Sequence, residues 1–223
     1  MSAALSDTAA PAATARAAAG GGGDIRFDLR LIADMIAPEA RVLDVGCGDG
    51  ALLDYLVHHK RVDGRGIELS QAGVNACVGL GLSVIQGDAD QDLAEYPAGA
   101  FDYVILSQTL HATRDPRGVL NQLVRIGARA VVSFPNPGLW VNRLRFLLRG
   151  QMRVIDWGAG DWYETANIHR CSISDFLRLC RTDGIAIEQG VILDSRGRPR
   201  GLRATGWLAN LLGAQGLFVL RRG

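Results

Sequence analysis

The sequence predicts one α/β domain built on a doubly wound, mostly parallel β-sheet that closes with an antiparallel C-terminal strand. From residue 24 onward, short β-branched runs alternate with amphipathic helical stretches. A glycine-rich turn joins the first of these runs to the helix that follows it. The last two apolar runs, Ile185–Leu193 and residues 216–220, form a candidate antiparallel pair. A length of 223 residues suits a single domain with a substantial core.

Composition excludes several classes of protein. With 48% apolar and 21% charged residues, the chain has the composition of a soluble globular domain. A net charge of +1 gives no long-range field that would attract nucleic acid or an anionic membrane, so we expect neither as a partner. The cysteines form no CxxC pair and no Cys/His cluster, which indicates reduced thiols in a cytoplasmic protein and no metal site. They are Cys47, Cys77, Cys171 and Cys180.

Residues 1–23 form a leader of mostly Ala, Gly, Ser and Thr that ends in a run of glycines. It has no long apolar segment, which argues against a membrane span or a signal peptide. Because it has little to bury, we expect disorder there and place the domain at residues 24–223. An organellar transit peptide is the alternative, although the leader has only Arg16 as a base.

The first half of the domain reads as two strand–turn–helix units. A helix precedes them and ends before Pro38; its apolar stripe is Leu29, Ile32, Ala33 and Ile36. The first unit is a strand at Arg41–Val45 and a helix at residues 51–58. The second is a strand at residues 64–68, the candidate N-cap Ser70 and a helix at Gln71–Gly79. Ser83–Gln86 is a third strand.

The next elements continue this alternation. Phe101–Ser107 is almost continuously apolar, as expected for a strand covered on both faces. Asp115 and Pro116 are a capping residue and a first-turn proline, so a helix begins there. Its buried stripe is predicted to be Leu120, Leu123, Val124 and Ile126. Residues 130–134 form the fifth strand.

Residues 135–170 interrupt the pattern with a helix at residues 140–148 and a Gly-rich stretch. Three tryptophans, Trp140, Trp157 and Trp162, lie in this region. Three interpretations are open: these side chains cover a substrate pocket, anchor an interface with another protein, or pack inside an irregular lid. Beyond it, a capping box predicts the start of a helix at residues 176–181. The basic loop at residues 196–203 is either a solvated turn or a contact for an acidic partner.

The segment VLDVGCGDG, residues 42–50, is the most informative part of the sequence. Its glycines permit positive φ and close approach of a ligand, and the helix after it presents free N–H groups. Dinucleotides and S-adenosylmethionine both bind turns of this kind. The glycine spacing alone does not separate them, because Gly46, Gly48 and Ala51 also fit the dinucleotide pattern.

Charge separates the two ligands. A pyrophosphate on this turn would meet the carboxylates of Asp44 and Asp49, and each encounter costs about 4 kcal/mol at ~4 Å and an effective dielectric of ~20. S-adenosylmethionine brings an ammonium and a sulfonium with a single carboxylate. We therefore expect Asp44 to help hold the ammonium, and the turn at Gly46, Cys47 and Gly48 to take the amino-acid part.

Polar residues follow the next three strands where a bound nucleoside would lie. Glu68 is suited to accept hydrogen bonds from ribose hydroxyls; a solvated carboxylate is the alternative. Asp88 and Ala89 are expected at the adenine, although Asp88 also fits a turn or capping residue. Ser107 lines the crevice at the carboxyl ends of the strands, or belongs to a polar rim without ligand contact.

The succession LDVGCGDG, GIELS, QGDAD and FDYVILSQTL resembles the Rossmann-like fold of class I S-adenosylmethionine-dependent methyltransferases. More closely, the chain resembles the MetW family of methionine biosynthesis proteins from about residue 27 to residue 220. The distinctive blocks are DYVILSQTL (102–110), AVVSFPN (130–136) and WYETANIH (162–169). The chain departs from the family pattern at His111, in the Gly-rich stretch before Trp162 and in its leader.

This resemblance implies a role in methionine biosynthesis, S-adenosylmethionine or S-adenosylhomocysteine as cofactor, and homoserine O-acyltransferase as a partner that the protein activates. The alternative is a methyltransferase that acts on an unknown small molecule. Methyl transfer from a sulfonium needs orientation more than a catalytic dyad, and the sequence shows no dyad. Candidates for a base are His111, Asp161, Tyr163 and His169. A structural role is the simpler interpretation of each, so no catalytic residue is assigned.

Overall fold

The computed structural model describes residues 25–150 and 168–223. The predicted leader lies outside these residues, as do Trp157, Asp161, Trp162 and Tyr163. Within the described ranges, no helix is long and apolar enough to cross a membrane.

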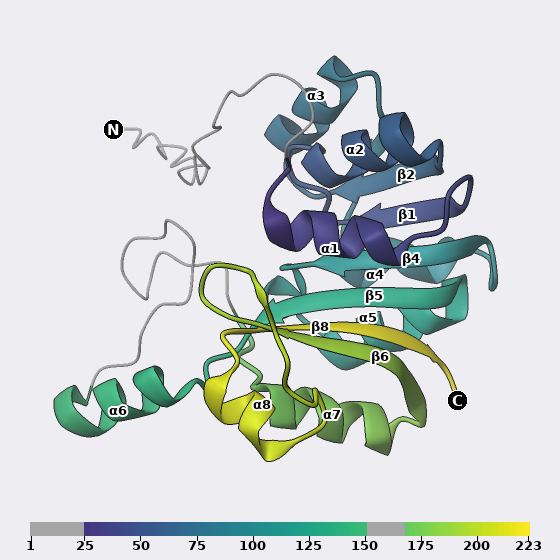
Figure 1. The fold of residues 1–223 in the computed structure, drawn as a ribbon. Coiled ribbons are helices and arrows are strands. Elements are labelled where there is room, and N and C mark those ends of the chain that lie inside the picture. Colours follow the sequence, from purple (N-terminus) through teal and green to yellow (C-terminus); the bar gives the residue numbers. More distant parts are fainter. Residues whose placement is uncertain (1–24, 151–167) are drawn as a thin grey trace, which may run out of the picture.

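The described residues form one eight-stranded sheet with the order β3-β2-β1-β4-β5-β8-β6-β7 (Figure 1). The parallel strands are β1 (Arg41–Val45), β2 (Asp63–Glu68), β3 (Ser83–Gln86), β4 (Phe101–Ser107) and β5 (Gly127–Pro135). The antiparallel strands are β6 (Ile185–Leu193), β7 (Pro199–Arg200) and β8 (Gln215–Arg222). The predicted fold class is confirmed, including the antiparallel C-terminal strand.

Helices cover both faces of the sheet. On one face lie α1 (Phe27–Met35), α2 (Ala51–Lys60) and α3 (Gln71–Gly79). The other face carries α4 (Ala89–Asp92), α5 (Pro116–Ile126), α7 (Ile173–Thr182), α8 (Trp207–Leu212) and the single 3₁₀ turns η1 (Leu93–Glu95) and η2 (Leu110–Ala112). Helix α6 (Trp140–Arg149) projects away from both layers (Figure 1).

The hydrophobic core lies on both sides of the central strands. Val104, Ile105 and Leu106 of β4 have no exposed surface, and successive side chains along β4 pack into opposite helical layers. Next to them, the rings of Phe134 and Phe176 lie 4.6 Å apart, and those of Phe176 and Phe218 lie 5.0 Å apart. This aromatic cluster joins β5, α7 and β8, and so fixes the antiparallel half of the sheet.

Local signals place most element boundaries correctly. Ser70 accepts a hydrogen bond from the Gly73 N–H at 3.1 Å, as its N-cap role predicts. Asp115 caps α5, and the predicted stripe of that helix is buried. Ser172 and Asp175 form the predicted capping box, but α7 begins at Ile173, earlier than expected. The predicted basic loop at residues 196–203 contains the short strand β7, which the sequence does not indicate.

Candidate functional site

The glycine turn lies between β1 and α2, at the carboxyl end of the sheet. Gly46, Gly48 and Gly50 have φ values of 72°, 58° and 83°, a region that favours glycine. A Cβ atom on Gly46 would lie 2.7 Å from the Thr109 Oγ1 atom, so the segment that follows β4 also packs against the turn. The predicted need for glycine at Gly46 therefore has two causes, backbone conformation and close packing.

Most N–H groups of the turn already have acceptors inside the protein. Gly46 and Cys47 donate to the Ile67 carbonyl at 2.8 and 3.3 Å, and Gly50 donates to the Cys47 carbonyl at 3.0 Å. Gly48 donates to the Glu68 Oε2 atom at 2.9 Å. A phosphate-binding turn presents its N–H groups to the ligand. In this turn the N–H groups of Gly46, Cys47 and Gly48 bind β2 and that of Gly50 binds the turn itself, which disfavours a dinucleotide.

Asp44 is the unusual residue of the site. It is 2% exposed, and burial together with the charge of Glu68 raises its pKa to about 7. Within the described ranges, the structure shows no cation and no hydrogen-bond donor on its carboxylate. A buried acid without a counter-charge is unfavourable unless a ligand supplies one. The ammonium of S-adenosylmethionine or S-adenosylhomocysteine fits this requirement.

Asp49 has a different environment from Asp44. Its Oδ1 atom accepts a hydrogen bond from Ala51 N–H at 3.2 Å, and the residue is exposed. The pKa of Arg26 is raised first by its hydrogen bond to Asp28 and least by the charge of Asp49. The repulsion of a pyrophosphate by Asp44 and Asp49 stays a prediction.

The predicted role of Cys47 is restricted by its packing. Its side chain is buried, with its Sγ atom 3.8 Å from that of Cys77 on α3. Burial and nearby acids raise the pKa of the Cys47 thiol above its ordinary value. The thiol thus packs under α3, and a ligand contact of Cys47 stays a prediction.

Glu68 links the turn to the second strand–helix unit. Its Oε2 atom accepts from Gly48 N–H, and its Oε1 atom accepts from Ser70 N–H at 2.9 Å. A Cβ atom on Gly73 would lie 2.7 Å from both the Glu68 Cγ atom and the Gly48 carbonyl oxygen, so α3 packs closely here. Each carboxylate oxygen keeps a lone pair for a further donor. The ribose contact of Glu68 remains a prediction.

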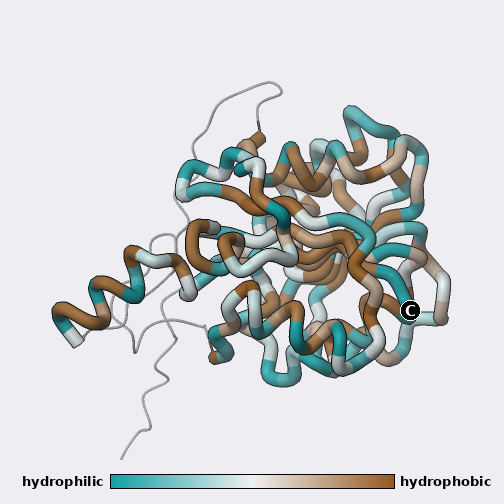
Figure 2. Tube along the Cα trace, turned by 60° about the horizontal axis from the view of Figure 1, so that its bottom comes forward, coloured by the Kyte–Doolittle hydropathy of each residue, from teal (hydrophilic) through white to brown (hydrophobic). Residues whose placement is uncertain are grey.

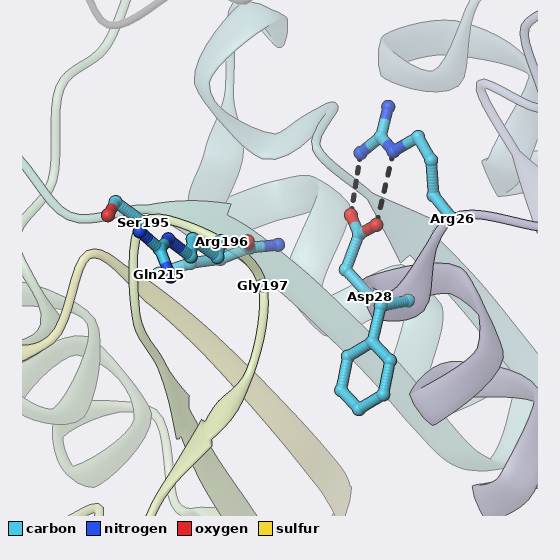
Figure 3. Close-up of a pocket in the computed structure, with 7 residues that line it drawn as sticks. Arg26, Asp28, Ser195, Arg196, Gly197 and Gln215 are labelled. Carbon is cyan, nitrogen blue, oxygen red and sulfur yellow. Dashed lines mark hydrogen bonds and ion pairs between the residues drawn. The ribbon is translucent and has the colours of Figure 1, made fainter.

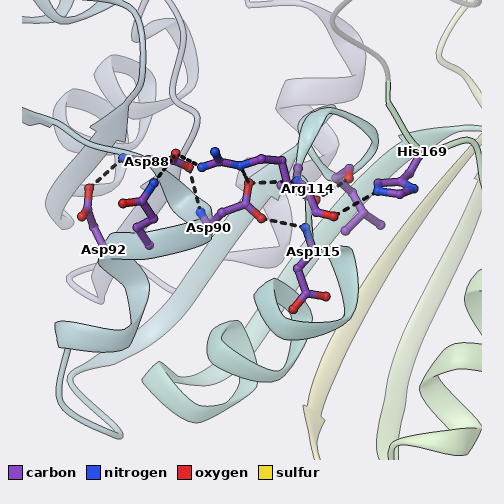
Figure 4. Close-up of polar contacts among 9 residues, drawn as sticks. Asp88, Asp90, Asp92, Arg114, Asp115 and His169 are labelled. Atoms are coloured by element: carbon purple, nitrogen blue, oxygen red, sulfur yellow. Dashed lines mark hydrogen bonds and ion pairs between the residues drawn. The ribbon is translucent and has the colours of Figure 1, made fainter.

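Asp88 is part of a network of polar contacts that Figure 4 shows. It caps α4 by accepting from the Asp90 N–H at 3.0 Å, and it forms an ion pair with Arg114. Asp90 in turn accepts from the N–H groups of Arg114 and Asp115 at 2.9 and 2.8 Å. The capping role is therefore confirmed. The adenine contact of Asp88 and Ala89 stays a prediction, and it would have to share the carboxylate with Arg114.

Ser107 ends β4 with its hydroxyl directed at the neighbouring strand. Its Oγ atom lies 3.1 Å from that of Ser133, to which the Gln108 Nε2 atom also donates at 3.2 Å. Gln108 has φ 57°, so the chain turns sharply after the strand. These contacts build the polar rim that the sequence indicates, and they leave a ligand contact of Ser107 as a prediction.

Sequence reasoning missed Arg114. It stands directly before the recognised cap of α5, but its partner Asp88 lies 26 residues earlier in the chain. His169 also contacts this residue, through a 3.0 Å hydrogen bond between its Nε2 atom and the Arg114 carbonyl oxygen. The N–H groups of Ile168 and His169 donate to the His111 carbonyl at 3.0 Å. Of the four candidate bases, the structure thus describes two, and it brings His111 and His169 together.

A cavity of about 270 Å³ lies beside α1 and the loop between β6 and β7. Figure 3 shows the paired side chains of Arg26 and Asp28 on one side and Arg196 and Gln215 on the other. Gln215 is 5% exposed, and its Nε2 atom has no hydrogen-bond partner among the described residues. The cavity thus combines two arginines with an unsatisfied amide.

In the described part of the chain, no group of three or more His, Cys, Asp or Glu residues is placed to hold a metal.

Solved structures with a similar architecture include S-adenosylmethionine-dependent methyltransferases. A possible histamine N-methyltransferase from Thermotoga maritima superposes with a TM-score of 0.59 at 16% identity, covering 88% of this chain and 87% of that one. The [4+2]-cyclase SpnF superposes with a TM-score of 0.61 at 19% identity, covering 87% of this chain and 80% of that one. These likenesses establish the Rossmann-like fold of S-adenosylmethionine-dependent methyltransferases.

The sequence comparisons are more specific. The bifunctional methionine biosynthesis protein MetXA/MetW of Rhodopirellula baltica is 30% identical over 179 residues, which are 76% of this chain and 29% of that protein. The chain thus spans less than a third of that relative. The family model of the methionine biosynthesis protein MetW matches residues 26–220. The chain belongs to the MetW family.

Proposed function

We propose that this protein is a methyltransferase-like regulator of methionine biosynthesis that binds S-adenosylmethionine or S-adenosylhomocysteine and activates homoserine O-acyltransferase in the cytoplasm. Family membership supports the pathway. The relative named MetXA/MetW carries two activities in one chain. We take its MetXA part to be the acyltransferase that the family resemblance implies. Fusion of two proteins favours the view that they also associate when they are separate.

The observation that carries the cofactor assignment is the buried Asp44 carboxylate, which has no counter-charge in the described structure. The cofactor brings an ammonium to this acid and, as S-adenosylmethionine, an activated methyl group on its sulfonium. We assign the amino-acid part to Asp44 and to the backbone of Gly46, Cys47 and Gly48. We assign the ribose to Glu68, the adenine to Asp88 and Ala89, and the crevice wall to Ser107.

The second candidate function is methyl transfer to a small molecule. The cavity lined by Arg26, Asp28 and Gln215 favours it, because its volume of about 270 Å³ is large enough for a small acceptor. SpnF, which has a similar fold, is described as a [4+2]-cyclase, so similarity of fold does not by itself indicate methyl transfer. The fold therefore leaves both functions open.

The two functions are separated by one set of assays on the purified chain. Acyl transfer by homoserine O-acyltransferase is measured with and without the chain, and with and without S-adenosylhomocysteine. The regulator predicts a stable complex and a faster acyl transfer. No complex and no change in rate would contradict it.

The methyltransferase is tested with methyl-labelled S-adenosylmethionine and a metabolite extract. It predicts a labelled small molecule with the wild-type chain and none with Asp44→Asn, which removes the acid proposed to hold the cofactor. An extract that stays unlabelled would contradict it.

A further inference from the structure

Helix α6 has no hydrophobic partner in the described structure. None of its residues is buried, whereas α5 and α7 each direct several apolar side chains into the core. Figures 1 and 2 show it projecting from the domain as an isolated arm. Helices this short are marginal in water unless a packed apolar face stabilises them. The helix therefore lacks the burial that would ordinarily stabilise it.

Helix α6 is strongly amphipathic. At 100° per residue, five of its six apolar side chains form one stripe with Arg143 and Arg145 on either edge, while Phe146 and Arg149 lie on the opposite face. Leu147 and Leu148 are 80% and 72% exposed, and Trp140 is 48% exposed. The stripe is Trp140, Val141, Leu144, Leu147 and Leu148. Trp140 therefore lies outside the hydrophobic core of the described domain, and its packing inside a lid stays a prediction.

The base of α6 is anchored to the domain. Asn136, which is 1% exposed, donates to the carbonyls of Asn210 and Gly213 at 2.9 and 2.8 Å and accepts from Gly138 N–H at 3.0 Å. Arg143 donates to the Gly138 carbonyl at 2.6 Å. The apolar stripe therefore extends from a point fixed by β5 and α8, as required of an element that presents a binding surface.

We propose that α6 is the element that docks on homoserine O-acyltransferase, with its apolar stripe in a groove of the enzyme whose rim carries carboxylates. This inference rests on the proposed function. An amphipathic helix that enters an apolar groove with residues spaced by three and four is a recurrent mode of recognition. The three arginines of α6, with no acid on the helix, define the complementary charge of the rim.

Two other occupants fit this surface less well. A second copy of the chain would bring two arginine-rich helices together, and the like charges would repel. An anionic membrane suits a basic amphipathic helix. However, the relative that carries MetXA and MetW in one chain favours a protein, since fusion keeps two partners at high effective concentration.

The test is a double variant, Leu147→Glu with Leu148→Glu, made in the full chain. Both side chains are largely exposed, so S-adenosylhomocysteine affinity and melting temperature should stay unchanged. The affinity for the purified acyltransferase should fall about tenfold or more, and activation should be lost. The matched control is Val78→Glu with Leu80→Glu on the α3 side, where the side chains are 58% and 49% exposed. It should bind and activate like the wild type.

The outcomes separate this inference from the proposed function. If the wild type activates the enzyme and the α6 variant does so equally, the docking role of α6 is wrong and the regulator stands. If the wild type neither binds nor activates, both are wrong. Binding of the wild type, but not of the variant, to phosphatidylserine vesicles without binding to the enzyme would overturn the inference in favour of a membrane. A wild-type dimer that the variant abolishes, again without enzyme binding, would overturn it in favour of self-association.

Discussion

In our proposal Asp44 determines the ligand chemistry of the glycine turn, because it is the one acid of the described site that is almost fully buried. Its pKa of about 7 results from burial and from the charge of Glu68. The unfolded chain releases this proton at a much lower pH. The unliganded protein should therefore lose stability as the pH rises from about 4 to about 7. A cationic ligand reverses this penalty, because it stabilises the ionised carboxylate.

This titration predicts the pH dependence of binding. Because the ligand prefers ionised Asp44, S-adenosylhomocysteine should bind about fivefold more weakly at pH 6 than at pH 7. Calorimetry in two buffers of different ionisation enthalpy should also show protons released at pH 6. The Asp44→Asn variant should bind weakly at both pH values and lose the dependence. Equal wild-type affinity at pH 6 and pH 7 would contradict the role of Asp44.

Gly46 gives a second test at the level of one residue. A side chain there would need a positive φ and would meet Thr109, whose hydroxyl is held by a 2.9 Å hydrogen bond to the Ser107 carbonyl. We expect Gly46→Ala to lower the free energy of unfolding by about 1–3 kcal/mol in urea denaturation. Gly79→Ala, on α3 with open space around the site, should be neutral or stabilise by up to about 1 kcal/mol. Similar losses in both variants would contradict this account.

Among the secondary-structure elements, those with strong local signals could be predicted from the sequence. Asp115 and Pro116 mark the start of α5, and continuous apolar character marks β4. Strand β7 has two residues and α8 has six, too few for a periodic pattern to stand out. They form because the antiparallel half of the sheet and the bonds of Asn136 hold them in place.

The same limit applies to the site. The positions of Asp44 and Glu68 could be predicted, because Asp44 is the next-to-last residue of β1 and Glu68 is the last residue of β2, at the carboxyl edge of the sheet. Arg114 could not, since its ion pair with Asp88 depends on how the segment before α5 packs against α4. The anchoring role of Asn136 also depends on tertiary contacts, with groups 74 and 77 residues later in the chain.

Asn136 provides the test at the level of elements. It connects the end of β5 to α7 and α8 through hydrogen bonds to the backbone, including one accepted from Ile173 N–H at 3.3 Å. Asn136→Ala would leave these buried groups without partners, so we expect a loss of about 2–4 kcal/mol in the free energy of unfolding. Asn75→Ala on exposed α3 should change it by less than about 0.5 kcal/mol. Urea titrations that give equal effects would exclude the anchoring role.

At the scale of the whole molecule, the two halves of the sheet have separate tasks in our proposal. Most residues assigned to the cofactor lie in strands β1 and β2 or in the segments that follow β1 and β3. Strand β5 leads to the proposed docking helix α6. Linkage requires that if the cofactor changes the affinity for the acyltransferase, the enzyme changes the affinity for the cofactor by the same factor. Two titrations, each with the other ligand saturating, should therefore give equal factors above one. Factors of one in both directions would exclude regulation by the cofactor.

The central claim is that the glycine turn accepts a cationic amino-acid nucleoside and rejects a diphosphate. Calorimetric titration of the wild-type chain with S-adenosylhomocysteine, followed by NAD, tests this claim most directly. We expect saturable binding of S-adenosylhomocysteine at one site, lost in Asp44→Asn, and no binding of NAD. Binding of NAD in competition with S-adenosylhomocysteine, or an unchanged affinity in Asp44→Asn, would contradict the claim.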